Sequence, residues 1–276
     1  MTNSMKITII DGPIGTQLID RGHSLSTPAW SATAIRDAPE ALSRLHRDYA
    51  QAGATIHTTN TFRTRFETVG ISWKDLTKSA VQIARQSVPR THKVAGSIAP
   101  LKDCYHPELS PKNPGPHHAE LAKVLYESGC DLLLCETFPH IQEALSAVQA
   151  AIDTGAETWV SFTAGPEANL LSPDEVHDGA NMAVRLGATG VLINCTPARD
   201  TGRYIEAIRS CGVPFGAYAN AGHPDDGLGW SSPQNHDGPK RYADIAAGWI
   251  DQGATIIGSC CGTGPAHIHE LKRRFG

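Results

Sequence analysis

Short runs of apolar, largely β-branched residues alternate with longer amphipathic segments along nearly the whole chain. Eight runs are predicted to be strands, at residues 6–10, 54–59, 93–98, 131–135, 157–162, 190–194, 214–219 and 255–258. Segments with helical spacing separate or follow them, at residues 39–52, 73–88, 117–128, 141–153, 173–186, 201–210, 241–251 and 266–275. Because the runs are apolar throughout, the pattern indicates a parallel sheet that helices cover.

The ends of the helical segments support this order of elements. Several segments begin with proline near the first turn, and several close on a glycine that leads into the next strand, as at Gly53, Gly129, Gly187 and Gly253. Eight such units in 276 residues predict an α/β fold built as a single (β/α)8 TIM barrel over residues 1–276. In that fold the active site lies at the C-terminal ends of the strands.

An open, doubly wound sheet is the alternative architecture. Its dinucleotide-binding form needs a glycine fingerprint after an early strand. Residues 11–16, Asp-Gly-Pro-Ile-Gly-Thr, lack the third glycine and are followed by no obvious helix, so this alternative is weak. The segments 16–37 and 100–116 are rich in Pro, Ser, Gly and His and are interpreted as βα loops.

Charge and hydropathy narrow the range of partners. The 24 basic and 28 acidic residues give a formal net charge of −4 and form no basic run, which argues against nucleic acid as a partner. No apolar stretch approaches the length of a membrane span, and the N-terminal run is too short for a signal peptide, so we expect no membrane partner and a cytoplasmic protein. A homo-oligomer is allowed but not indicated.

The cysteines point to metal binding or catalysis. Seven cysteines is an odd number, and most lie in apolar, strand-like segments, so reduced thiols are expected rather than disulfides. Cys195 ends the sixth predicted strand, and Cys260 and Cys261 follow the eighth, so all three are expected at one rim of the barrel. Three thiolates with a fourth position open are typical of a catalytic zinc site. The alternative is that they are small buried apolar side chains.

Other polar residues follow the predicted strands. Asp11, Glu136 and Asn220 each come at a strand end and would converge on the same mouth, although any one of them could simply terminate its strand. Asp11 could begin a turn, and Glu136 could cap the helix that follows. Histidines are a further set of conceivable ligands, but each is more consistent with a satisfied or solvated side chain: His57, His117, His118, His223 and His236.

Five motifs together resemble the homocysteine S-methyltransferase family. They are Asp-Gly-x-x-Gly-Thr at 11–16, Cys-Glu-Thr at 135–137, Ile-Asn-Cys at 193–195, Ala-Asn-Ala-Gly at 219–222 and Gly-Ser-Cys-Cys-Gly-Thr-Gly-Pro-Ala-His-Ile at 258–268. Members of that family include betaine- and S-methylmethionine-dependent enzymes and the homocysteine module of cobalamin-dependent methionine synthase. The resemblance runs over essentially the whole chain and implies a TIM barrel with a three-cysteine zinc site.

The resemblance also implies roles for individual residues. Cys195, Cys260 and Cys261 would be the Zn²⁺ ligands and the catalytic centre, and Asp11 and Glu136 would bind the amino group of homocysteine. Asn220 would lie in a turn near the site. Trp30 matches the segment that lines the methyl-donor side.

The donor side departs from the family pattern. Arg63 falls where betaine enzymes carry an aromatic residue, and a cation is a poor neighbour for a quaternary ammonium group. Arg63 could instead grip a donor carboxylate through its planar fork, or be a surface residue. Residues 163–171 are compact, Ala219 replaces a usual proline, and His223 stands where an acidic residue is common.

The leading hypothesis is therefore a zinc-dependent methyltransferase. It would move a methyl group from a small onium donor, such as S-methylmethionine, S-adenosylmethionine or betaine, to the zinc-activated thiol of homocysteine, forming methionine. Alternatives are a different thiol or selenol acceptor, or demethylation of a methylated thiol. A corrinoid protein could act in trans. A non-enzymatic alternative is a zinc-storing or redox-sensing protein that uses Cys260 and Cys261 as a vicinal disulfide.

Overall fold

The fold is known from a computed structural model that describes residues 6–26, 28–230 and 237–276. Within these residues eight parallel strands form one sheet in the order β1-β8-β7-β6-β5-β4-β3-β2. The strands are β1 Thr8–Ile9, β2 Ile56–Thr58, β3 Lys93–Ile98, β4 Leu132–Phe138, β5 Thr158–Phe162, β6 Gly190–Pro197, β7 Phe215–Asn220 and β8 Ile256–Ser259. The predicted TIM barrel is thus confirmed.

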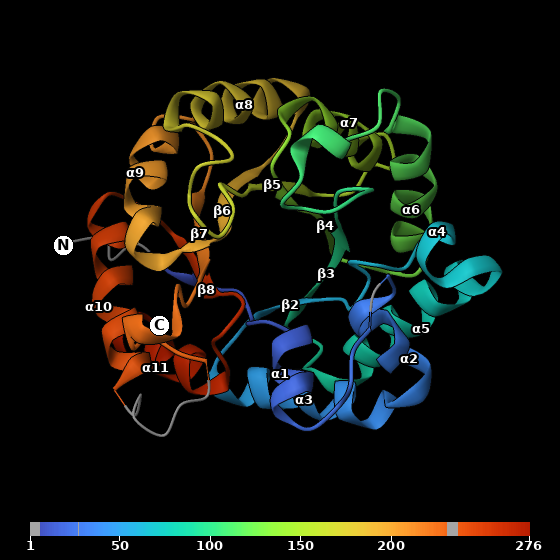
Figure 1. Cartoon of the computed structure of the whole chain (residues 1–276), viewed down its shortest axis with the longest axis horizontal. Coiled ribbons are helices and arrows are strands. Elements are labelled where there is room, and N and C mark those ends of the chain that lie inside the picture. The colour runs from blue at the N-terminus through green and yellow to red at the C-terminus, as the bar shows by residue number, and fades with distance from the viewer. Residues whose placement is uncertain (1–5, 27, 231–236) are drawn as a thin grey trace.

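Helices form the outer ring around the strands (Figure 1). The α-helices are α1 Gly15–Asp20, α2 Ala34–Asp37, α3 Pro39–Ala52, α4 Phe66–Val69, α5 Trp73–Ser87, α6 Gly115–Glu127, α7 Ile141–Ile152, α8 Pro173–Leu186, α9 Ala198–Ile208, α10 Gly238–Asp251 and α11 Pro265–Phe275. Short 3₁₀ turns lie at η1 Trp30–Thr33, η2 Gly70–Ser72, η3 Pro107–Leu109 and η4 Pro224–Asp226. No helix in the described part of the chain combines the length and apolar character needed to cross a bilayer.

Helix ends agree with the prediction where the sequence carries a strong signal. Helix α8 has Pro173 in its first turn, and its N-cap Ser172 forms a reciprocal capping box with Glu175. Helix α3 ends at Ala52 and is capped by Gly53, whose φ of 109° is readily adopted only by glycine.

The segment after residues 11–16 corrects the prediction. It was expected to be a loop with no helix, but it contains α1, η1 and α2. Helix α1 is only 6 residues long, and its N-cap Ile14 offers no side-chain hydrogen bond, so the sequence carried no start signal there.

The apolar core has two layers, because side chains alternate between the two faces of each strand. Along β4, Leu132 and Leu134 belong to the group of buried side chains inside the barrel. Leu133, between them, belongs to the larger group that packs the strands against the helices. The barrel interior is therefore a filled core, and open space is left at its mouth.

The barrel closes between its first two strands. Among the described residues a single parallel bridge joins them, from Ile10 to Ile56. The Thr55 amide donates to the Ile9 carbonyl oxygen at 2.8 Å, and the Asp11 amide donates to the Ile56 carbonyl oxygen at 3.0 Å. These contacts between the two strands hold Asp11 beside the end of β2, where Asp11 forms part of the wall around the mouth of the barrel.

Candidate active site

A cavity of about 570 Å³ opens at the C-terminal ends of the strands. Its wall contains nearly every residue proposed for the site from the sequence: Asp11, Trp30, Arg63, Glu136, Cys195, Cys260 and Cys261. The exception is Asn220, which lies behind the wall. Its Nδ2 donates to the Cys195 carbonyl oxygen at 2.9 Å, and its Oδ1 accepts from the Gly222 amide at 2.8 Å. Asn220 thus supports the backbone that presents Cys195.

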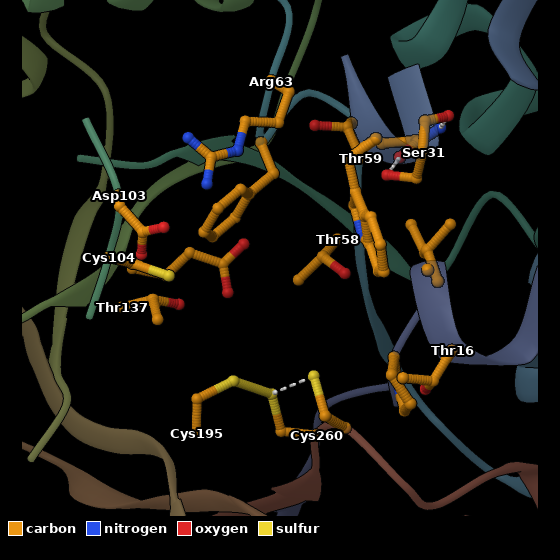
Figure 2. A pocket seen from close by; sticks show the side chains of 18 of the residues that line it. Thr16, Ser31, Thr58, Thr59, Arg63, Asp103, Cys104, Thr137, Cys195 and Cys260 are labelled. Carbon is orange, nitrogen blue, oxygen red and sulfur yellow. Dashed lines mark hydrogen bonds between the residues drawn. A yellow bond between two sulfur atoms is a disulfide. The ribbon is translucent and has the colours of Figure 1, made fainter. Parts of the chain in front are cut away.

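Three cysteine sulfurs meet at one end of this cavity. The Sγ atoms of Cys195, Cys260 and Cys261 all lie within 4.8 Å of one another, and the Cys260 and Cys261 sulfurs are 4.0 Å apart. Cys195 and Cys260 are joined as a disulfide (Figure 2). The expectation of reduced thiols is therefore wrong for this pair, because two strand ends bring the sulfurs into contact across β7. The other five cysteines are free: Cys104, Cys130, Cys135, Cys211 and Cys261.

Two β-bulges direct the side chains of Glu136 and Cys195 into the cavity. Register shifts interrupt β4 between Cys135 and Phe138, and β6 between Asn194 and Pro197. Within them Thr137 and Cys195 adopt positive φ angles of 63° and 48°. Left-handed backbone is unfavourable for such residues and is typically held in place by its surroundings at functional sites.

Asn194 connects the two bulges. Its Oδ1 accepts from the Thr137 amide at 3.0 Å and from Ser161 Oγ at 2.7 Å, and its Nδ2 donates to Thr137 Oγ1 at 2.7 Å. The side chain is completely buried. Glu136 on β4 and Cys195 on β6 are therefore positioned by one hydrogen-bonded unit that also includes β5.

Two buried carboxyl groups face the cavity. Asp11 accepts hydrogen bonds of 3.0 Å from both the amide and the hydroxyl of Thr58. Glu136 accepts from Ser97 Oγ and, at 2.9 Å, from Tyr218 Oη. Burial raises the pKa of both carboxyl groups, and for Asp11 the charge of Glu136 adds to that effect. A cation bound between them would relieve this penalty, so the pair suits an ammonium group.

Asp11 also belongs to a second group of titratable side chains, in which His46 is the member that the sequence did not single out. Asp11, His46 and His57 place one ligand-type atom each within 4.8 Å of one another. His57 was expected to be satisfied or solvated; its Nε2 lies 3.1 Å from the Nδ1 of His92, and its Nδ1 lies 3.9 Å from Asp11 Oδ2. The Nδ1 atoms of His46 and His57 have no hydrogen-bond partner among the described residues. The histidine hypothesis at His236 lies outside those residues.

The opposite side of the cavity is formed by loops after β2 and β3. Figure 2 shows Arg63 across the cavity from Cys195 and Cys260, with Asp103 and Cys104 beside it. Arg63 is half-buried, its guanidinium lies 5.3 Å from the Phe62 ring centre, and its Nη1 donates to the Lys102 carbonyl oxygen at 3.1 Å. Sequence reasoning missed Arg65, a buried arginine that also lines this wall.

A closed parallel barrel with three sulfurs and two buried carboxyl groups around one cavity is a TIM-barrel enzyme with a candidate thiolate metal centre. The family model described as homocysteine S-methyltransferase matches residues 8–275. The chain belongs to the homocysteine S-methyltransferase family, as its motifs indicated, and is a methyltransferase with small-molecule substrates.

Individual relatives agree with this assignment over nearly their whole lengths. The chain is 29% identical to homocysteine S-methyltransferase of Escherichia coli K12, with 99% of this chain and 97% of that protein covered. It is 28% identical to selenocysteine Se-methyltransferase of Brassica oleracea var. italica, with 97% and 88% covered. Among solved structures, the metallated homocysteine methyltransferase MmuM of Escherichia coli superimposes with a TM-score of 0.82 at 25% identity, covering 98% of this chain and 96% of that one.

Proposed function

We propose that this protein transfers a methyl group from a small onium donor to the thiol of homocysteine, with Zn²⁺ held by Cys195, Cys260 and Cys261. The observation that carries the proposal is that the three sulfurs and the carboxyl groups of Asp11 and Glu136 face the same cavity. The proposal treats the chain as one catalytic domain working in the cytoplasm.

The three cysteines suit zinc by chemistry and by spacing. Thiolates are preferred zinc ligands, and ligands about 2.3 Å from a tetrahedral ion lie about 3.8 Å apart, close to the 4.0 Å between the Cys260 and Cys261 sulfurs. The disulfide between Cys195 and Cys260 uses two of the three sulfurs, so it and the zinc-bound form exclude each other. When bound, zinc would hold the acceptor sulfur as a thiolate, the reactive form of a thiol.

Asp11 and Glu136 would orient the acceptor. Their paired negative charge would bind the ammonium group of homocysteine, and the ammonium would stabilise both carboxylates in turn. With its two ends held, the acceptor sulfur would face the open cavity in a fixed direction, and such orientation is a large part of the acceleration of an in-line transfer.

The transfer itself is a displacement at carbon. The acceptor thiolate sulfur forms a bond to the methyl carbon while the bond from that carbon to the donor's onium atom breaks. The electron pair of the broken bond stays on the donor, which leaves as a neutral thioether or amine, and the thiol proton goes to solvent. The rings of Trp30 and Phe62 line the donor side and would stabilise an onium cation by cation–π attraction.

The test is an assay of zinc-loaded, reduced protein with homocysteine and S-methylmethionine, S-adenosylmethionine or betaine. We expect methionine to form, and we expect Cys260→Ser to lose both zinc, measured by elemental analysis, and turnover. Cys211→Ser is the matched control, since Cys211 lies in another part of the barrel and should retain both properties. Absence of methionine with every donor would contradict the proposal.

A selenol acceptor is the second candidate, because one relative is a selenocysteine Se-methyltransferase. A selenol is more acidic than a thiol and depends less on a metal for its ionisation. Competition between homocysteine and selenocysteine at equal concentration would rank the two acceptors. Faster methylation of selenocysteine at saturating zinc would favour this second candidate.

A further inference from the structure

We propose that Arg65 binds the carboxylate of an amino-acid methyl donor, and so selects donors that carry one. The inference rests on the proposed methyl transfer to homocysteine and adds the residue and the chemical class by which the donor is recognised. It concerns a residue that lies outside the cysteine and acidic groups already described.

Arg65 is a buried cation with unused donors. Its side chain is 8% exposed and lines the cavity. Nη1 donates to the Pro100 carbonyl oxygen at 2.6 Å, whereas Nε and Nη2 have no hydrogen-bond partner among the described residues. Both nitrogens have almost no exposed surface, so a carboxylate that binds them must displace the side chains that cover them. These two nitrogens form one edge of the guanidinium, the edge that grips a carboxylate through two parallel hydrogen bonds. A buried guanidinium left in this state favours an anion as its partner.

The acidic side chains around Arg65 are engaged elsewhere. Glu143 accepts from the Leu101 amide at 2.7 Å and from Ser110 Oγ at 2.6 Å. Glu67 is exposed and lies 3.6 Å from His117. Burial and the neighbouring Arg63 lower the pKa of Arg65 to about 10, which still leaves the guanidinium charged at neutral pH.

Arg65 also borders a small outer cavity of about 30 Å³, together with Glu67 and His117. That space holds little more than one water molecule. The main cavity, at about 570 Å³, is the one that can admit a substrate carboxylate beside Arg65.

The position of Arg65 favours the donor over the acceptor. The groups proposed for homocysteine lie at the ends of β1, β4, β6 and β8, whereas Arg65 follows β2 and immediately precedes α4. Arg63, two residues earlier, lies across the cavity from the cysteines (Figure 2). A donor that points its onium group at the acceptor sulfur would extend its far end toward this wall, where Arg65 and Arg63 provide positive charge.

The experiment compares two donors on the reduced, zinc-loaded enzyme. S-methylmethionine carries the α-carboxylate, and (3-aminopropyl)dimethylsulfonium is its decarboxylated analogue. For Arg65→Met we expect kcat/KM for S-methylmethionine to fall about 10- to 100-fold, with the analogue changed less than about threefold and the KM for homocysteine unchanged. Arg65→Lys should be intermediate, because one ammonium cannot reproduce the fork. Arg209→Met, an exposed arginine on the outer ring, is the control.

Each other outcome would overturn the inference in a recognisable way. Equal losses on both donors would make Arg65 a structural residue, and a melting curve of Arg65→Met would reveal the instability. A raised KM for homocysteine would assign Arg65 to the acceptor. No methionine from the unmodified enzyme with S-methylmethionine, S-adenosylmethionine or betaine would overturn the proposed function itself. Normal turnover with an unchanged donor ratio in Arg65→Met would overturn only the role of Arg65.

Discussion

His46 is a buried histidine in the barrel wall, and its burial determines its protonation state. It projects from α3 into the buried layer beside β2 and is 1% exposed. Its Nδ1 lies near Asp11 and His57 and has no hydrogen-bond partner in the part of the chain that the structure describes. Burial lowers the pKa of His46 to about 4, and burial together with its histidine neighbours lowers that of His57 to about 3. Both imidazoles are therefore neutral in the folded protein over most of the pH range.

These histidines should make the protein sensitive to acid. Below about pH 6.5 the unfolded chain binds protons that the folded protein does not, so stability falls as the pH drops, by up to about 1.4 kcal/mol per pH unit for each group, until the folded pKa is reached. Urea unfolding at pH 7, 6, 5 and 4.5 should show this loss, and a smaller slope in His46→Gln. An identical slope in that variant would contradict the assignment.

From the strand pattern alone, a residue could be assigned to the site only if it follows a predicted strand. Asp11, Glu136 and the three cysteines could be placed in one cavity because each follows a predicted strand, and ends of parallel strands share a face. Arg65 could not be found in this way. Its significance lies in its burial and in two unused nitrogens, which depend on how the loops after β2 and β3 pack.

At the scale of elements, the bulges in β4 and β6 set the geometry of the site. The sequence predicted strands ending at 135 and 194, whereas the structure continues them to Phe138 and Pro197 through the bulges. A bulge is defined by register with neighbouring strands, so local periodicity carries no signal for it. The helices were easier to predict, because Pro173 and Gly53 act on the backbone locally.

Asn194 is expected to hold these bulges together. Asn194→Ala leaves the Thr137 amide without its buried partner and should reduce the free energy of unfolding by about 1–3 kcal/mol. Because Glu136 and Cys195 would shift, we also expect weaker zinc binding and a higher KM for homocysteine. Ser161→Ala, which keeps the bonds between Asn194 and Thr137, is the milder control. Normal zinc affinity and KM in Asn194→Ala would limit its role to stability.

At the scale of the whole molecule, the seam at β1, where this short first strand joins β8 on one side and β2 on the other, is the thinnest part of the barrel. Strand β1 has only 2 residues, pairs with β8 at two positions and meets β2 through the single bridge. Helix α11 packs against α3, β1 and β8 and so covers this seam. Its inner face presents Ile268 and Leu271, both completely buried.

Leu271→Ala should therefore destabilise the entire fold. Truncating a buried leucine costs about 2–5 kcal/mol, and at the seam the loss should appear as one cooperative shift of the urea midpoint. Ile71→Ala is the matched control, since Ile71 is 90% exposed and should change stability by less than about 0.5 kcal/mol. A separate early transition would mean that α11 detaches without unfolding the barrel.

Two kinds of segment line the cavity: strand ends and loops. The sulfurs and Glu136 sit at strand ends or in bulges tied across the sheet, whereas Arg63, Arg65 and Cys104 sit on loops after β2 and β3. Loops accept insertion and substitution far more readily than strands do. Substitutions in the loops after β2 and β3 could therefore change the methyl donor that the enzyme accepts, while the strand ends that bind the acceptor stay the same. Mutant libraries limited to these two loops are the most direct way to alter donor specificity.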